Sequence, residues 1–243
     1  MKTGEGAKIA ILRWEQDYVP EGLLQLERMA GNSTNRDSYP FPVRLEEVKG
    51  ACSETVIIHP SREILNRMIS MVKEMEKEGI RAVTTSCGFN AIFQKELADA
   101  VDIPVFTSAL LQVPFAQAII GRNHSVGIIT ANWEALTKEH LHACNITDDM
   151  KYYVQGLENC REWSKIFEHP EEPFDMEAVS LEIMGAVAEG IKAHPDTGLI
   201  LLECTDLPPY ARRIREEFGV PVMDINSLVG YVAIAIGEMN LYS

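Results

Sequence analysis

The sequence lacks several features that would assign it to a common class of binding protein. It has 22 lysines and arginines against 36 aspartates and glutamates, a formal net charge of −14, so a nucleic-acid partner is not expected. No apolar run reaches the roughly 18 residues that a membrane-spanning helix needs. Glycine-rich nucleotide-binding patterns of the G-x-G-x-x-G and Walker types are missing as well. The remaining classes are an enzyme or a binding protein for a small molecule.

Paired cysteine spacings are also missing. The five cysteines are odd in number and widely spaced, without a C-x-x-C pair, so neither a disulfide framework nor a structural zinc site is expected. His140 and His142 would face different ways on a helix, and no metal site is expected there. The apolar run "IAIL" near the start is too short for a signal-peptide core. We therefore expect a cytoplasmic protein with free thiols.

What the sequence does contain is a regular alternation of two patterns. Short runs rich in valine and isoleucine predict strands, and segments with apolar residues at helical spacing lie between them. This alternation is typical of an α/β fold with parallel sheets covered by helices. The predicted strands are 8–14, 55–59, 80–86, 103–107, 125–130, 151–157, 198–203 and 220–225. The predicted helices are 63–77, 90–100, 110–121, 176–193, 209–218 and 227–238, and 168–174 is expected to be a loop.

The two halves of the chain match each other at a constant offset of 117 positions. The matched pairs are Cys87 with Cys204, Pro104 with Pro221, Ile9 with Val126, and Val83 with Ile200. Chance phasing of two generic α/β patterns is one interpretation. The one we favour is internal duplication, which predicts two α/β lobes related by a pseudo-twofold axis, each a small parallel sheet flanked by helices.

Both cysteines of the first pair follow a predicted strand and precede a predicted helix. Ligands of parallel sheets bind at the carboxyl ends of the strands, so two facing lobes would bring Cys87 and Cys204 to one cleft. A thiolate on one side of a carbon atom and a thiol on the other can remove a proton and return one. N–H groups at the start of each following helix favour the thiolate and can hold a carboxylate. This pairing predicts that the two cysteines are functional.

At these residues the sequence resembles the aspartate/glutamate/hydantoin racemase superfamily. The resemblance rests on "TTSCGFNAIFQ" around Cys87, "LLECTDLPPY" around Cys204 and "VGIIT" at the start of the second half. It implies two Rossmann-like lobes, the first from 1–108 plus 218–243 and the second from 109–217. It also implies an active site in the cleft between the lobes, and no cofactor.

The resemblance further implies a role for individual residues. Cys87 and Cys204 would be the catalytic acid/base pair. The expected substrate-binding residues are Gly88, Phe89, Thr130, Thr205 and Trp14, of which Gly88, Phe89 and Thr205 would hold the carboxylate. The sequence departs from the amino-acid racemases at "RWEQDY" (13–18), at Gly88-Phe89 in place of Asn-Thr, and at Glu203 in place of a glycine.

The "CGF" form is similar to a lyase branch of the same superfamily, which cleaves dimethylsulfoniopropionate to acrylate and dimethyl sulfide. Trp14, Tyr18, Phe89 and Trp133 could surround a cationic sulfonium, because aromatic faces attract cations; core packing is the other interpretation. His59, Glu15 and Asp17 are weaker candidates that follow predicted strands.

The function predicted first is a cofactor-independent amino-acid racemase or epimerase, with a small-molecule carboxylate as substrate. The dimethylsulfoniopropionate-type lyase is the alternative. A non-catalytic two-lobed protein that binds a small metabolite is the second alternative. A homo-oligomer is left open.

Overall fold

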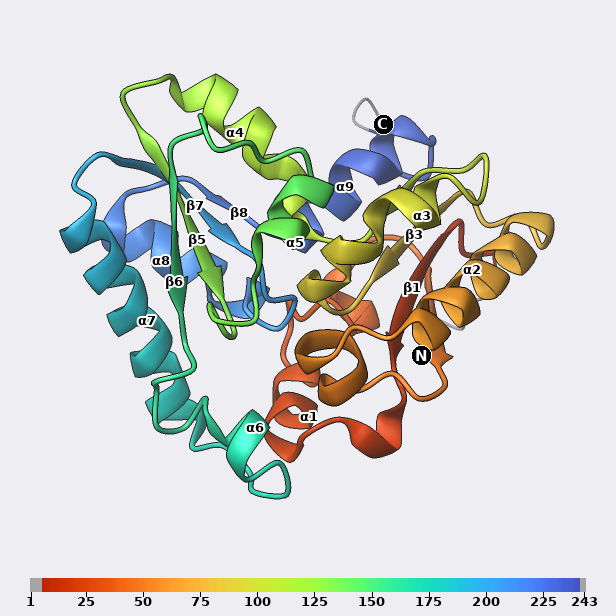
Figure 1. Cartoon of the computed structure of the whole chain (residues 1–243), viewed down its shortest axis with the longest axis horizontal. Helices are drawn as coiled ribbons and strands as arrows, with labels where there is room; N and C mark the ends of the chain where they lie inside the picture. Colours follow the sequence, from red (N-terminus) through yellow and green to blue (C-terminus); the bar gives the residue numbers. More distant parts are fainter. Residues whose placement is uncertain (1–5, 241–243) are drawn as a thin grey trace.

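The computed structural model describes residues 6–240, and the strands in this part of the chain form two four-stranded sheets (Figure 1). Every pairing is parallel, in the order β2-β1-β3-β4 in one sheet and β6-β5-β7-β8 in the other. The α/β fold class is therefore confirmed, and the shared order agrees with an internal duplication. The strands are β1 (Ile9–Trp14), β2 (Val43–Val48), β3 (Ala82–Thr85), β4 (Val105–Phe106), β5 (Ser125–Thr130), β6 (Tyr152–Gly156), β7 (Thr197–Leu202) and β8 (Val222–Met223).

Helices flank both sheets (Figure 1). They are α1 (Glu21–Glu27), α2 (Arg62–Lys77), α3 (Gln94–Ala98), α4 (Val113–Ile120), α5 (Lys138–Ala143), α6 (Lys165–Glu168), α7 (Met176–Ala193), α8 (Ala211–Phe218) and α9 (Ile225–Ala235). In α2, Ser61 caps the first turn by accepting from the Glu63 N–H, and Ile64, Met68 and Val72 are buried on one face. The helix predicted at 63–77 is therefore confirmed, and its buried apolar residues lie on one face.

The predicted strand at 55–59 is wrong. Glu54–Ile58 forms a π-helical turn, η3, with Val56 and Ile57 buried, because a short apolar run fits a buried turn as well as a strand. The second strand of the first sheet is instead β2, whose sequence "VRLEEV" lies at the sheet edge and pairs with β1 alone. Edge strands tolerate charged side chains, so β2 lacks the apolar run that marks the inner strands.

Two predicted helices begin with tighter turns than the pattern indicated. The residues after Cys87 form a 3₁₀ turn, η4 (Gly88–Phe93), before α3 begins, and η5 (Ala109–Gln112) precedes α4 in the same way. A 3₁₀ turn leaves its first N–H groups directed back toward the residue that precedes it. In η4 that residue is Cys87.

The start of α9 is tied to the first half of the chain. The Asn226 amide donates to the Gly31 carbonyl at 2.6 Å, and the Tyr39 hydroxyl donates to Asn226 Oδ1 at 2.9 Å. These contacts agree with a C-terminal segment that returns to the first lobe. The division into 1–108 plus 218–243 and 109–217 stays a prediction, and its ends at residues 1–5 and 241–243 lie outside the described residues.

Within residues 6–240, the longest helices are too short or too polar to cross a lipid bilayer.

Candidate active site

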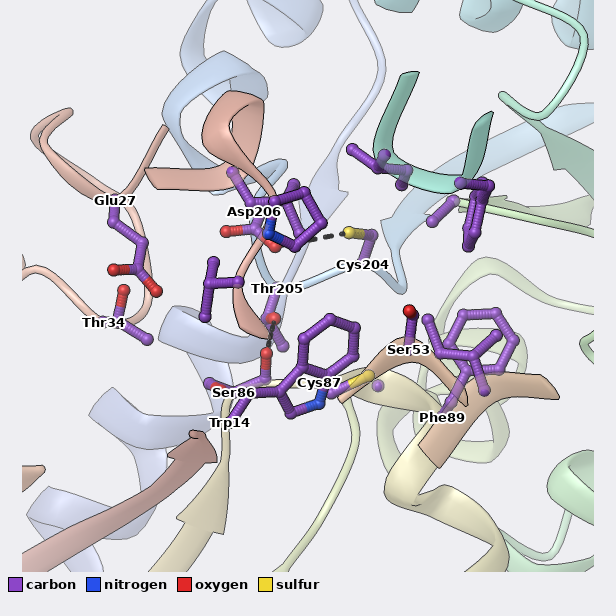
Figure 2. A pocket seen from close by; sticks show the side chains of 18 residues that line it. Trp14, Glu27, Thr34, Ser53, Ser86, Cys87, Phe89, Cys204, Thr205 and Asp206 are labelled. Atoms are coloured by element: carbon purple, nitrogen blue, oxygen red, sulfur yellow. Dashed lines mark hydrogen bonds between the residues drawn. The ribbon is translucent and has the colours of Figure 1, made fainter. Parts of the chain in front are cut away.

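A pocket lies where strand ends from the two sheets meet (Figure 2). Trp14 is the last residue of β1, Cys87 follows β3, and Cys204 follows β7. The carboxyl ends of parallel strands are the usual place for a ligand. The polar, sulfur-bearing and aromatic lining consists of Trp14, Glu27, Thr34, Ser53, Ser86, Cys87, Phe89, Phe167, Cys204, Thr205 and Asp206, together with the backbone of Gly88.

The two thiols share this pocket, and each is almost fully buried, with 8% of Cys87 and 9% of Cys204 exposed. Burial raises the pKa of the Cys87 thiol, and the Glu203 carboxyl raises it further, while the N–H groups of Phe89 and Asn90 lower it. Burial also raises the pKa of Cys204, followed by the effect of Asp206. Both cysteines therefore rest as thiols and need a proton acceptor to become reactive.

Asp206 provides such an acceptor for Cys204. Cys204 Sγ lies 3.9 Å from Asp206 Oδ2 (Figure 2). The Asn32 amide donates to the other carboxyl oxygen at 2.8 Å. Burial raises the pKa of Asp206 to about 7, and the hydrogen bond from Asn32 acts in the opposite direction. A carboxyl with this pKa can take up and release a proton near neutral pH.

Glu27 adds a second acidic group to the lining, beside Thr34 (Figure 2). Burial raises the pKa of Glu27, and Arg13 and the hydrogen bonds with Thr34 and Gln16 lower it. Trp14 contributes its indole ring, whose buried Nε1 has no hydrogen-bond partner among the described residues. No lysine, arginine or histidine of residues 6–240 lines the pocket. The part of the pocket that is lined by Glu27 and Trp14 is therefore suited to a positively charged group.

A hydrogen bond joins the two cysteine-bearing loops. The Thr205 hydroxyl donates to the carbonyl of Ser86, the residue before Cys87 (Figure 2). The bond therefore runs from the neighbour of one thiol to the neighbour of the other. It fixes the two loops relative to each other beside the pocket.

The structure brings together most of the residues that the sequence selected. Cys87, Cys204, Gly88, Phe89, Thr205 and Trp14 all line the pocket. Thr130 does not line it: its hydroxyl donates to Glu203 Oε2 at 2.7 Å, and both side chains are fully buried. Contact of Thr130 with a substrate would therefore require Glu203 to move.

Several of the weaker candidates lie elsewhere. Tyr18 and Trp133 are 59% and 52% exposed and do not line this pocket, so only Trp14 and Phe89 remain from the predicted aromatic set. His59 is an exposed side chain, and Glu15 accepts the Gly50 N–H at 2.7 Å. His59 follows the η3 turn and not a strand, and the hydrogen bond to Gly50 holds Glu15 away from the pocket.

The sequence did not single out Glu27, Thr34, Ser53 or Asp206. Asp206 stands two residues after Cys204. This spacing could have predicted it as a site residue, because a side chain two positions further along the same strand-end loop lies near the thiol. Glu27 and Thr34 reach the pocket from α1 and the segment after it. No local pattern marks them, since only the packing of α1 against the site brings them there.

The side chains that lie close enough together to hold a metal ion are found away from this pocket. Within residues 6–240 the metal-ligand side chains that cluster are His169, Glu171 and Glu172, all exposed and none in the pocket lining. His140 is buried against Phe89, with ring centroids 5.7 Å apart, and its ring Nδ1 lies 2.9 Å from the Thr137 hydroxyl. These contacts account for His140 as part of the packing.

The amino-acid sequence is similar to one protein family and to several known enzymes. Residues 54–229 match the family model described as Asp/Glu/Hydantoin racemase. A dimethylsulfoniopropionate lyase of Durusdinium sp. clade D is 30% identical over 90% of this chain and 71% of its own length. Dimethylsulfoniopropionate lyase 7 of Emiliania huxleyi (strain CCMP1516) is 27% identical over 90% of this chain, which spans 64% of that protein.

Solved structures with a similar fold include an allantoin racemase from Pseudomonas fluorescens, with a TM-score of 0.59, 16% identity, and coverage of 94% of this chain and 91% of that one. A glutamate racemase from Bacillus anthracis has a TM-score of 0.53, 14% identity, and coverage of 96% and 83%. At these identities the likeness concerns the fold.

Proposed function

The chain belongs to the Asp/Glu/hydantoin racemase family, and on that premise we propose that it is a lyase that cleaves dimethylsulfoniopropionate to acrylate and dimethyl sulfide. The two similar dimethylsulfoniopropionate lyases, from Durusdinium and Emiliania huxleyi, support this substrate. The chain spans 71% and 64% of their lengths. The reaction begins with loss of a proton from the carbon next to a carboxylate, a step that lyases and racemases have in common.

The observation that carries the proposal is the distribution of charge in the pocket. The lining holds the carboxyls of Glu27 and Asp206 and the indole of Trp14, without a cationic side chain among the described residues. A sulfonium cation is attracted by these groups. Aspartate or glutamate would bring a second carboxylate into the same acidic pocket, and like charges repel. A zwitterion with one carboxylate fits better.

The proposed chemistry uses the groups at the strand ends. Cys204 gives its proton to Asp206 and becomes a thiolate, which removes the proton from the carbon next to the substrate carboxylate. The electron pair forms the carbon–carbon double bond while the carbon–sulfur bond breaks. Dimethyl sulfide leaves as a neutral molecule, and acrylate and one proton remain, so no further reagent is needed.

The opposite thiol and the backbone complete the site. The N–H groups of Phe89 and Asn90 are directed at Cys87, and Cys87 approaches the pocket from the other loop. In this proposal Gly88, Phe89 and Thr205 hold the substrate carboxylate. Removing a general base typically lowers the rate about 10²- to 10⁴-fold.

The experiment incubates the purified chain with dimethylsulfoniopropionate and measures dimethyl sulfide in the gas phase and acrylate in solution. Wild type is expected to release both in equal amounts, and Cys87→Ser and Cys204→Ser to lose at least about 100-fold in rate. Cys52→Ser, at a half-buried cysteine that does not line the pocket, is the matched control and should keep its activity.

The racemase is the second candidate, since a pair of thiols in one pocket also suits proton exchange on two faces. Its test is exchange of the α-proton for deuterium in aspartate, glutamate, allantoin and hydantoins. Exchange with loss of optical purity, and no dimethyl sulfide, would replace the lyase proposal. Binding of these compounds without any turnover would instead indicate the two-lobed binding protein.

A further inference from the structure

Glu203 is a buried acid that the proposed reaction does not use. It stands between Leu202, the end of β7, and Cys204, and its side chain is fully buried. Its Oε2 accepts the Thr130 hydroxyl at 2.7 Å, while its Oε1 has no hydrogen-bond partner among the described residues. A buried carboxylate with a single neutral donor and no paired cation is strongly disfavoured against its protonated form.

The same carboxyl also touches the loop of the other cysteine. A Cβ atom added to Gly88 would lie 2.0 Å from Glu203 Oε1 and 2.4 Å from the Glu203 carbonyl oxygen. Glu203 therefore fills the space that a side chain at position 88 would need. Because Gly88 follows Cys87 and Glu203 precedes Cys204, this one side chain lies against both cysteine-bearing loops.

The titratable groups around Glu203 offer it no positive charge. Cys87, Cys204 and Cys144, at the end of α5, all respond to the Glu203 charge, which raises the pKa of each thiol. Asp206 lies beyond Cys204, and burial lowers the pKa of His140 to about 4, so His140 is neutral. No lysine or arginine is paired with Glu203 within residues 6–240.

Burial raises the pKa of Glu203 itself to about 7. Its ionisation therefore falls in the range in which the enzyme would have to form a thiolate. Two negative charges that act on each other in a buried site of low polarity disfavour each other. The carboxyl and the thiols titrate as a coupled group in which one negative charge excludes the next.

We propose that Glu203 is a positioning residue that must remain a neutral acid for the negative charge of the site to rest on the thiols. The hydrogen bond from Thr130 holds the Glu203 carboxyl in place. When this carboxyl ionises, its negative charge prevents the cysteines from forming thiolates. The catalytic meaning of this control rests on the proposed function, in which the thiols transfer protons. The ionisation of the thiols can be measured without any substrate.

The test is the rate of alkylation of Cys87 and Cys204 by iodoacetamide as a function of pH, read separately for each cysteine by peptide mass spectrometry. Glu203→Gln keeps the shape and the acceptor for Thr130 but cannot ionise. Above about pH 7, alkylation of Cys87 is expected to be about tenfold faster in Glu203→Gln than in wild type, which corresponds to one pKa unit. Well below pH 7 the two proteins should react alike.

Glu189→Gln, at an exposed position on α7, removes one charge elsewhere and should follow wild type. Identical alkylation profiles for wild type and Glu203→Gln would overturn the proposal. An infrared titration of Asp206→Asn, which lacks the other buried carboxyl with a pKa of about 7, covers the case in which Glu203→Gln does not fold. Loss of a buried protonated-carboxyl band near pH 7 supports the proposal, and an acid already ionised well below that pH overturns it.

These readouts do not depend on the substrate. An altered alkylation profile in a protein that releases no dimethyl sulfide would reject the lyase and keep the role of Glu203. Lyase activity with the same alkylation profile in wild type and Glu203→Gln would support the lyase and reject the role of Glu203.

Discussion

In the proposed reaction, Asp206 converts the unreactive thiol of Cys204 into a base. Burial holds both Cys204 and Asp206 in their protonated forms to higher pH than in water. The carboxyl can nevertheless ionise near neutral pH, while the thiol on its own cannot. The 3.9 Å contact between Cys204 Sγ and Asp206 Oδ2 therefore gives the proton a place to go.

Asp206→Asn is expected to lower the rate of dimethyl sulfide release about 10²-fold or more, because the amide cannot accept the proton of Cys204. In wild type the rate should rise with pH as Asp206 loses its proton and fall again as Glu203 loses its own, both near pH 7, so the profile should be bell-shaped. That rise should be absent in the variant. The measurement is a pH profile of kcat/KM for both proteins.

Asp206→Glu, which keeps a carboxyl, is the control and should retain the rise near neutral pH. A wild-type-like profile in Asp206→Asn would mean that another group takes the proton.

At the level of elements, the inner strands could be predicted and the edge strand could not. β1 and β5 are buried on both faces and read as continuous apolar runs. β2 lies at the edge, where Arg44 forms ion pairs with Glu46 and Glu78. Because these charged residues interrupt the apolar pattern, β2 was not predicted as a strand. The cysteine pair was predicted because both residues end strands at a constant offset. Glu27 was missed because its position depends on how α1 packs.

The contact between the loop after β3 and the end of β7 leads to a prediction about stability. Gly88→Ala should lower the free energy of unfolding by about 1–3 kcal/mol, since its Cβ would overlap Glu203. Glu203→Gly should not fully rescue this variant, because the backbone carbonyl of residue 203 lies 2.4 Å from the same position. Urea-induced unfolding measures both effects.

Gly185→Ala is the matched control. Gly185 lies inside α7, and a Cβ there would meet nothing within 4 Å. Alanine is favoured over glycine in a helix by about 1 kcal/mol, so this variant should be no less stable than wild type. A Gly88→Ala protein as stable as Gly185→Ala would contradict the close approach.

For the whole molecule, the buried acids of the site connect folding to pH. Burial raises the pKa of Glu203 and Asp206 to about 7 in the folded chain, and that of Glu27 in the same direction. In the unfolded chain such groups titrate near pH 4. Between these values the folded state binds more protons than the unfolded state, so the free energy of unfolding falls as pH rises.

Glu203→Gln is therefore expected to weaken the pH dependence of stability between about pH 4 and pH 7. The free energy of unfolding of the variant should exceed that of wild type most at the upper end of this range. There the wild-type protein must either ionise a buried carboxyl or keep it protonated against the pH of the solvent. Urea unfolding at several pH values is the measurement. Glu189→Gln, on the surface, should leave the slope unchanged, and a wild-type slope in Glu203→Gln would contradict the buried ionisation.

The hydrogen bond from Thr205 to the Ser86 carbonyl has a consequence for how the site opens. The two sheets supply one thiol each, and this bond is a latch between the loops that carry them. Any movement that parts the sheets to admit a bulky molecule has to release the latch and draw the thiols away from each other. Under the proposed function, a protein opened in this way would be inactive until the bond has re-formed with a substrate between the two thiols.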